Sequence, residues 1–281
     1  MLSATGVRVR ARQESEERRP RVSLSGLLLL PAVVFVLFVA VPLAALTYRA
    51  VRSGQLLDSL AQPAIRDALR ISLTTSLLTV AIVLVLGTPL AYLLARRDFP
   101  GKALIDTLVD LPMVLPPVVA GVALLMAFGR RGVFGPALDG AGLDVAFTAK
   151  AVVAAQIFVS SPFYIRAARV GFQGVDETLE QAAAVDGASP LRGFLHITLP
   201  LSLPALASGI VLCWARALSE FGATMMFAGN LRGTTQTMSL AIMTAMESNL
   251  YTALAMSVIL LGVAFATLLL FRALTRQGLR L

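Results

Sequence analysis

The most distinctive chemistry in the sequence lies in a polar, alanine-rich segment between two long apolar runs. It reads Glu-Gln-Ala-Ala-Ala-Val-Asp-Gly over residues 180–187, and Ile-Thr-Leu-Pro follows over residues 197–200. Asp176 and Glu177 favour the start of a helix, since negative charge complements its dipole, and Gly187 ends that helix. Ser189 and Pro190 favour a second short helix toward Pro200. Two short helices with small side chains are suited to enter a groove on another protein. The alternative is an amphipathic connector lying on a bilayer.

Two charges stand inside a later apolar run. Arg216 and Glu220 are four residues apart, so they share a helix face and can neutralise each other. Charges within such a run indicate either function or an internal ion pair that fastens helices. Ser219, Thr224 and Asn230 offer hydroxyl and amide donors to an oxyanion, although such residues also join helices to one another.

Prolines interrupt another apolar run. Pro112, Pro116 and Pro117 remove backbone donors, which predicts a disturbed helix that serves either as a structural kink or as a gate. We expect no metal site, because His196 has no accompanying His, Cys or carboxylate cluster. The single cysteine, Cys213, allows no disulfide within the chain and is interpreted as a packed apolar thiol.

Composition decides the class of protein that carries these groups. Hydrophobic residues make up 57% of the 281 residues, charged residues only 14%, and the mean hydropathy is +0.80, which excludes a soluble domain. The net charge of +8 does not call for a nucleic-acid partner, because the basic residues cluster at the ends of apolar segments. The sequence predicts an all-α, polytopic membrane protein.

Six apolar runs are long enough to cross a hydrocarbon core, which needs about 20 residues. We expect a basic, disordered arm over residues 1–24 and a transmembrane domain over residues 25–281, with a retained first helix rather than a cleaved signal peptide. The predicted spans are Leu27–Val51, Leu69–Ala95, Leu104–Phe128, Ala149–Val170, Leu201–Phe227 and Tyr251–Leu274.

The basic residues predict the orientation. With both termini in the cytoplasm, about fifteen Lys and Arg residues fall inside and about eight outside, as the positive-inside rule requires. The polar segment, taken as residues 171–199, then faces the cytoplasm. We therefore expect a multi-pass protein of the plasma (inner) membrane, surrounded by lipid.

The polar segment resembles the cytoplasmic coupling loop of ABC importer permeases, whose pattern is Glu-Ala-Ala, three residues, Gly, nine residues, Ile-x-Leu-Pro. Gly187, Ile197, Leu199 and Pro200 match it in register, as do Ala182 and Ala183. Gln181 occupies the place of the glutamate, and Glu180 stands one residue earlier, which weakens any role for a carboxylate at position 181. The similarity extends from about residue 69 to residue 274 and implies the type I permease architecture. We refer to residues 171–199 as the coupling loop.

Three further stretches resemble molybdate permeases. These are Leu111–Gly121 with the following Gly129–Gly132, then Ala215–Thr224, then Thr235–Ile242. The resemblance implies import of molybdate or tungstate by a homodimer of permeases, an ABC ATPase dimer at the cytoplasmic face and an extracytoplasmic oxyanion-binding protein. Sulfate and thiosulfate permeases are close relatives, so a sulfate importer is the alternative.

The sequence contains no Gly-x-x-x-x-Gly-Lys-Ser/Thr phosphate loop and no catalytic set. We therefore expect a subunit that is not an enzyme, carries no cofactor and relies on ATP and magnesium bound by its partner. An ion-gradient-driven secondary transporter would show inverted repeats with broken helices, and none is visible. A membrane enzyme would be active without any ATPase.

Overall fold

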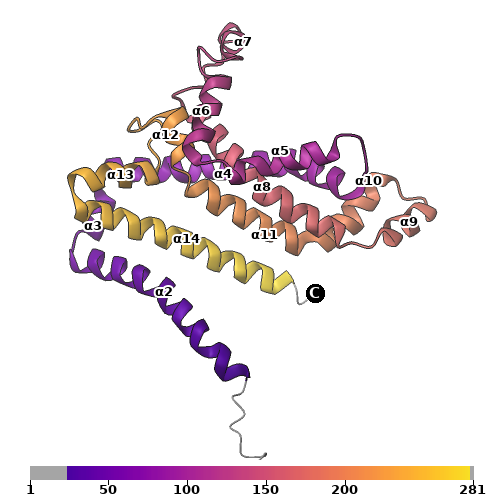
Figure 1. Cartoon of the computed structure of the whole chain (residues 1–281), viewed down its shortest axis with the longest axis horizontal. Coiled ribbons are helices and arrows are strands. Elements are labelled where there is room, and N and C mark those ends of the chain that lie inside the picture. The colour runs from indigo at the N-terminus through magenta and orange to yellow at the C-terminus, as the bar shows by residue number, and fades with distance from the viewer. Residues whose placement is uncertain (1–23, 279–281) are drawn as a thin grey trace, which may run out of the picture. The chain divides into compact units, whose positions relative to one another are not determined.

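The computed structural model describes residues 24–278, and it describes their side chains except those of residues 24–27, 57, 60 and 270–278. The predicted arm therefore lies almost wholly outside the described residues. Within the described range the chain is helical and contains no strand, which confirms the all-α class (Figure 1). The elements are α2 (Leu24–Arg52), α3 (Leu56–Ala61), α4 (Pro63–Arg96), α5 (Lys102–Val114), α6 (Pro117–Phe128), α7 (Gly135–Gly140), α8 (Ala149–Gln173), α9 (Glu177–Val185), α10 (Pro190–Gly193), the π-helix η1 (Phe194–Thr198), α11 (Leu199–Leu218), α12 (Gly222–Ala228), α13 (Met238–Ser248) and α14 (Leu250–Gly278).

The chain divides into two units, residues 1–49 and residues 50–281. In the described part of the first unit, α2 is apolar along its length and long enough to cross a membrane. The second unit holds all the candidate site residues.

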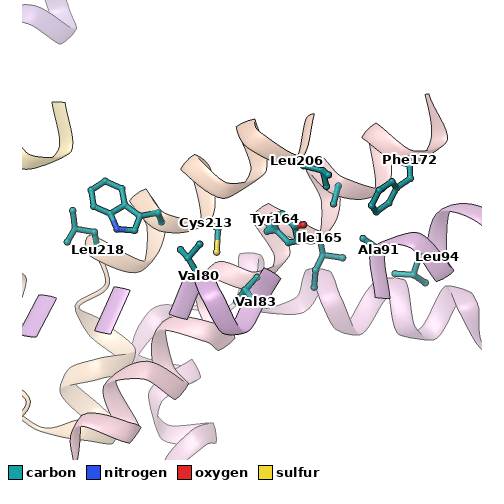
Figure 2. Close-up of a cluster of buried hydrophobic side chains, with 12 residues drawn as sticks. Val80, Val83, Ala91, Leu94, Tyr164, Ile165, Phe172, Leu206, Cys213 and Leu218 are labelled. Atoms are coloured by element: carbon teal, nitrogen blue, oxygen red, sulfur yellow. The ribbon is translucent and has the colours of Figure 1, made fainter. Parts of the chain in front are cut away.

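The centre of the second unit is formed by α4, α8 and α11. Figure 2 shows Val80 and Val83 of α4, Tyr164 and Ile165 of α8 and Cys213 of α11 in one buried cluster. Small residues bring these helices close together. An added Cβ at Gly171 of α8 would lie 2.6 Å from Ala205 Cβ of α11, and one at Gly209 of α11 would lie 2.8 Å from Ala167 Cβ of α8. Membrane helices lack a hydrophobic drive to associate, so such close packing stabilises them.

Polar contacts also join the central helices. Thr79 of α4 donates a hydrogen bond to the Gln156 side chain of α8 at 3.0 Å, and Thr88 of α4 bonds the Tyr164 hydroxyl at 2.6 Å. Two ion pairs, Arg169 with Asp106 and Arg166 with Asp110, hold α5 against α8.

The third predicted span is corrected by the structure, because it is not one continuous helix. α5 ends at Val114 and α6 begins at Pro117, with Leu115 and Pro116 extended at ψ of 134°. A residue that precedes a proline is driven out of the α region. Leu115 precedes Pro116, and Pro116 precedes Pro117, so both residues are affected. Pro117 then takes the favoured first helical position. The predicted disturbance of the helix is therefore a complete break.

α6 packs on α12, and glycines permit the contact. An added Cβ at Gly121 would lie 2.7 Å from the Ala223 carbonyl oxygen, and one at Gly222 would lie 2.7 Å from Pro117 Cβ. α12 was expected within the fifth span. The structure instead ends that helix at Leu218, and α12 is a separate helix whose first turn is capped by Glu220.

Five of the described helices or helical runs are long and apolar enough to cross a membrane. They are Leu28–Arg52, Pro63–Arg96, Ala149–Gln173, Pro190–Leu218 and Leu250–Leu269, and Pro117–Phe128 is a shorter apolar helix. The chain is thus a multi-pass membrane protein, as composition predicts.

Candidate functional site

Helix α9 begins after Asp176 and ends before Gly187, as the sequence predicts, and the structure shows the hydrogen bonds that fix both ends. Asp176 accepts a hydrogen bond from the Thr178 N–H at 2.9 Å and caps α9, and this bond lowers the pKa of the Asp176 carboxyl. Gly187 adopts φ of +85°, with Gly187 N–H donating to the Ala184 carbonyl and Ala188 N–H to the Ala183 carbonyl. This pair of bonds is the Schellman motif, which requires a left-handed residue and therefore favours glycine.

α10 differs in detail from the predicted second helix. Pro190 begins it, but the Ser189 hydroxyl makes no capping bond, and α10 ends at Gly193. The chain continues as the π-helix η1, in which the N–H of Leu199 donates to the carbonyl of Phe194, five residues earlier. Pro200 contributes to this change, since it has no N–H with which to continue the regular α-helical pattern.

Glu180 is the centre of the contacts that hold the coupling loop. Its carboxylate lies 3.0 Å from Arg96 Nη2 at the end of α4, and it accepts hydrogen bonds from the Thr198 hydroxyl at 2.5 Å and the Tyr92 hydroxyl at 3.3 Å. Arg96 also donates to the Val175 carbonyl at 2.8 Å and lies 3.4 Å from Glu177. The Arg96 side chain is only 7% exposed, so this is a nearly buried charge whose two Nη groups have several partners, while its Nε makes no hydrogen bond.

An aromatic cluster adjoins this network. Tyr92 meets Phe172 and Phe194 edge-on, with ring centroids 5.6 and 4.9 Å apart. α4, α8 and η1 therefore pack together through these three rings. α9 and α10 lie together beside the end of α8 and the start of α11 (Figure 1). A cavity of about 280 Å³ opens between α4 and the loop and is bordered by Arg97, Gln181 and Ser189.

The loop residues divide into anchored and presented sets. Glu180, Ala183, Ile197 and Leu199 are half-buried, whereas Gln181, Ala182, Gly187 and Pro200 are exposed. Apolar side chains also stand in the open on α9, α10 and η1: Val185 is 87% exposed, Leu191 66% and Leu195 45%. The exposed face therefore carries small and apolar side chains together with the exposed charges of Asp186 and Arg192, and Glu180 is the charged residue of the loop that is half-buried against the helices.

Arg216 and Glu220 lie together at the other end of α11. Arg216 Nη1 is 2.7 Å from Glu220 Oε2, an ion pair without the alignment of a hydrogen bond, and the Glu220 side chain is 1% exposed. Glu220 Oε1 accepts a hydrogen bond from the Ala223 N–H at 2.8 Å, which caps α12. Glu220 therefore has a structural task besides neutralising Arg216, and sequence spacing did not indicate it.

The remaining candidates are dispersed. Ser219 is exposed and donates to the Arg216 carbonyl, and Thr224 is buried within the contact of α12 with its neighbours. Asn230 donates to the Thr244 hydroxyl and accepts from Gln236, both at 2.9 Å. Pro116 and Pro117 are exposed at the break between α5 and α6. Ser219 thus meets Arg216 through the backbone carbonyl, whereas the side-chain amide of Asn230 is engaged with Thr244 and Gln236.

Sequence reasoning missed three residues. Arg96 and Tyr92 complete the Glu180 network, and the only sequence signal was the basic end of the second span. Arg232 borders a polar cavity at the starts of α4 and α14, and no pattern singled it out. His196 is exposed, with its ring Nδ1 3.0 Å from the Arg192 carbonyl oxygen, and the described residues contain no His, Cys or carboxylate cluster suited to a metal.

Residues 87–277 match the family described as "Binding-protein-dependent transport system inner membrane component". The chain belongs to this family. The match includes the coupling loop and the helices that hold it, and it begins later than the similarity expected from residue 69. Membership confirms the permease architecture and a location in the inner membrane.

Curated relatives of this inner membrane component share substantial identity. The molybdenum transport system permease protein of Mycobacterium bovis is 39% identical over 92% of this chain and 98% of its own length. That of Escherichia coli is 46% identical over 65% of this chain and 80% of its own length. The molybdate/tungstate transport system permease protein of Thermococcus kodakarensis is 42% identical over 68% of this chain and 72% of its own length.

Solved structures share the fold. One is a chain of the bacterial alginate ABC transporter, solved in complex with an alginate pentasaccharide-bound periplasmic protein. It has a TM-score of 0.72 at 19% identity, and the match covers 92% of this chain and 95% of the transporter chain. A chain of the MetNI methionine ABC transporter in inward-facing conformations has a TM-score of 0.58 at 15% identity, covering 75% of this chain and 94% of its own.

Proposed function

We propose that this chain is the permease subunit of an ABC importer that moves molybdate or tungstate into the cytoplasm. The observation that carries the proposal is similarity over nearly the whole length to the M. bovis protein named as a molybdenum transport permease. The related protein named for molybdate and tungstate supports the same class of tetrahedral oxyanion.

The coupling loop receives the mechanical input in this proposal. Its exposed face, with Val185, Leu191 and small alanines, enters a groove on an ATPase subunit that binds ATP and magnesium. Closure of the ATPase dimer moves α9 and α10. The Glu180 contacts transmit that movement to α4 through Arg96 and to α11 through Thr198. The permease then exchanges inward-open and outward-open states.

Two permease copies form the pathway, and an extracytoplasmic binding protein delivers the oxyanion. Both termini and the coupling loop face the cytoplasm. The chain itself performs no catalysis and binds no cofactor, because the energy of transport comes from the partner ATPase.

Reconstituted transport tests the function. Proteoliposomes that contain the permease, its ATPase and its binding protein should accumulate radiolabelled molybdate only with internal ATP. Excess tungstate should compete strongly and excess sulfate weakly. Uptake of sulfate in preference to molybdate would make this a sulfate importer, and uptake driven by an ion gradient without ATP would overturn the ABC mechanism.

Cysteine labelling tests the orientation. In a Cys213→Ala background, single cysteines are placed at Ser189 in the coupling loop and at Thr234, which is exposed in the turn before α13. A membrane-impermeant maleimide should label Thr234→Cys in intact cells and Ser189→Cys only after permeabilisation. Labelling of position 189 in sealed cells would place the loop on the wrong side for an ATPase.

A further inference from the structure

A second polar cavity lies at the opposite end of α4 from the coupling loop. Its volume is about 240 Å³, and it is bordered by the start of α4, the start of α14, the last two turns of α13 and Arg232. This is smaller than the roughly 300–1,000 Å³ of pockets for drug-sized ligands, so it suits a small ion. α4 has 34 residues, about 51 Å at 1.5 Å per residue, which exceeds the roughly 30 Å hydrocarbon core and leaves a helix end outside it.

A tight turn presents Arg232 to this cavity. The Leu231 carbonyl accepts hydrogen bonds from the N–H groups of Thr234, Thr235 and Gln236, and Leu231 N–H donates to the Thr235 hydroxyl at 3.0 Å. Gly233 supplies the positive φ, +75°, that the turn needs. The backbone of this turn therefore defines the point from which the Arg232 side chain leaves the chain beside the cavity.

Buried amides extend from this turn to α13. The Gln236 side chain, in a residue only 5% exposed, borders the cavity and donates one Nε2 hydrogen bond to Asn230, which in turn donates to Thr244. Gln236 Nε2 carries two N–H groups, and only this one bond is made among the described residues. A buried donor with spare capacity thus faces a polar cavity.

The starts of two long helices add positive potential. Gln62 and Ala64 belong to the N-terminal end of α4, and Asn249 and Thr252 to that of α14. Asn249 Oδ1 accepts from the N–H groups of Tyr251 and Thr252, so its amide NH₂ remains available. The end of α13 at Ser248 has the opposite polarity, but the Asn249 N–H caps the Ala245 carbonyl at 2.7 Å.

No carboxylate borders the cavity, and Arg232 forms no ion pair with any described acidic residue. The Thr244 and Ser248 hydroxyls already donate to backbone carbonyls. The Arg232 guanidinium, the amides of Gln236 and Asn249, the Thr252 hydroxyl and two helix N-termini border the cavity without a compensating negative charge. Such a set favours an anion with several acceptor oxygens.

We propose that this cavity is an oxyanion-binding site on the permease itself, centred on Arg232 and occupied by a tetrahedral divalent oxyanion. The proposal rests on the proposed function for the identity of the anion and for the placement of this end of α4 outside the cytoplasm. In that orientation the site lies where an anion released by the binding protein first meets the permease.

Direct binding tests the site without transport. The permease–ATPase complex in nanodiscs, without binding protein, is titrated with radiolabelled molybdate by equilibrium dialysis, with tungstate, sulfate and chloride as competitors. Saturable binding that tungstate displaces is expected. Arg232→Gln should weaken it about tenfold or more, since a charge-assisted contact is lost, and Arg232→Lys should restore part of it. Thr252→Val should weaken binding to a smaller extent.

Arg131→Gln is the matched control, because Arg131 is also exposed, forms no ion pair among the described residues and does not border the cavity. It should bind molybdate as the unaltered chain does. Arg232→Gln should also keep the melting temperature of the complex, since no ion pair is removed, so weaker binding would not reflect misfolding.

The outcomes separate the two proposals. Absence of saturable binding, or equal binding by the Arg232→Gln and Arg131→Gln variants, overturns the site whether or not molybdate is transported. Arg232-dependent binding of an oxyanion supports the site even if reconstituted transport fails. If Arg232→Gln instead weakens association with the anion-free binding protein while molybdate binding is unchanged, Arg232 is a docking contact and the site is overturned.

Discussion

The two ends of α4 use arginine in opposite ways. Arg96 is nearly buried and held by Glu180, Glu177 and the Val175 carbonyl, whereas Arg232, beside the start of α4, is exposed and has no carboxylate partner among the described residues. A nearly buried charge with several partners fixes the relative positions of the elements that share it. An unpaired charge in a polar cavity is available to a ligand. Arg216 is intermediate, with one buried carboxylate and no aligned hydrogen bond.

The largest effect is expected from breaking the Arg96 network. Glu180→Ala leaves a nearly buried guanidinium without its nearest carboxylate and should cost about 3 kcal/mol of stability, because removing one partner strands the other charge. Stimulated ATPase should fall as well, since α9 loses its link to α4. Thermal unfolding and ATPase assays of the reconstituted complex measure both.

Gln181→Ala is the matched control for Glu180→Ala. Gln181 is exposed and makes no contact of this kind, so its removal should leave stability within about 0.5 kcal/mol. Equal losses from the two variants would show that the carboxylate does not anchor the loop.

A smaller effect is expected at the intermediate arginine. Arg216→Met leaves the Glu220 carboxylate, 1% exposed, without its counter-charge and should cost about 2 kcal/mol. Adding Glu220→Gln should recover much of this loss, because the amide oxygen can still accept the Ala223 N–H. Strictly additive losses in thermal unfolding would mean that the two residues act separately.

The smallest change in stability is expected at the turn of the coupling loop. Gly187→Val places a side chain at φ of +85°, which costs about 1–2 kcal/mol, while the space around the added Cβ is open. Because the face that enters the ATPase groove is altered, transport and stimulated ATPase should fall together.

Gly142→Val separates strain from docking. Gly142 also has a positive φ, +70°, and open space around it, but it lies after α7, outside the coupling loop. It should lose similar stability and keep transport. Full transport by Gly187→Val in proteoliposomes would overturn the coupling role.

Local pattern was sufficient for much of the coupling loop. The start of α9 at Asp176 and Glu177 and its end before Gly187 follow from residue types within a single turn, and the structure has both. The structure also explains why the coupling loop has Gln181 where the family pattern has glutamate. Gln181 is exposed, whereas Glu180, one residue earlier, turns toward α4. Sequence spacing could not show which of the two carries the contacts, because Arg96 is 84 residues from Glu180.

The sequence by itself determined the class of this protein. Long apolar runs must leave water, and a bilayer lets only self-satisfied helices span it, so an all-α membrane protein followed from composition and run length. The spacing of the coupling-loop motif then indicated the family to which the chain belongs.

Only the tertiary structure decided where helices end and which polar groups meet. The prolines favour the break at Leu115 and Pro116, but the packing of α6 on α12 through Gly121 and Gly222 is a property of the tertiary structure alone. The cavity at Arg232 needed the starts of α4 and α14 to converge from positions far apart in the chain. Such contacts depend on how helices pack against one another, and periodicity within one helix contains no information about its neighbours.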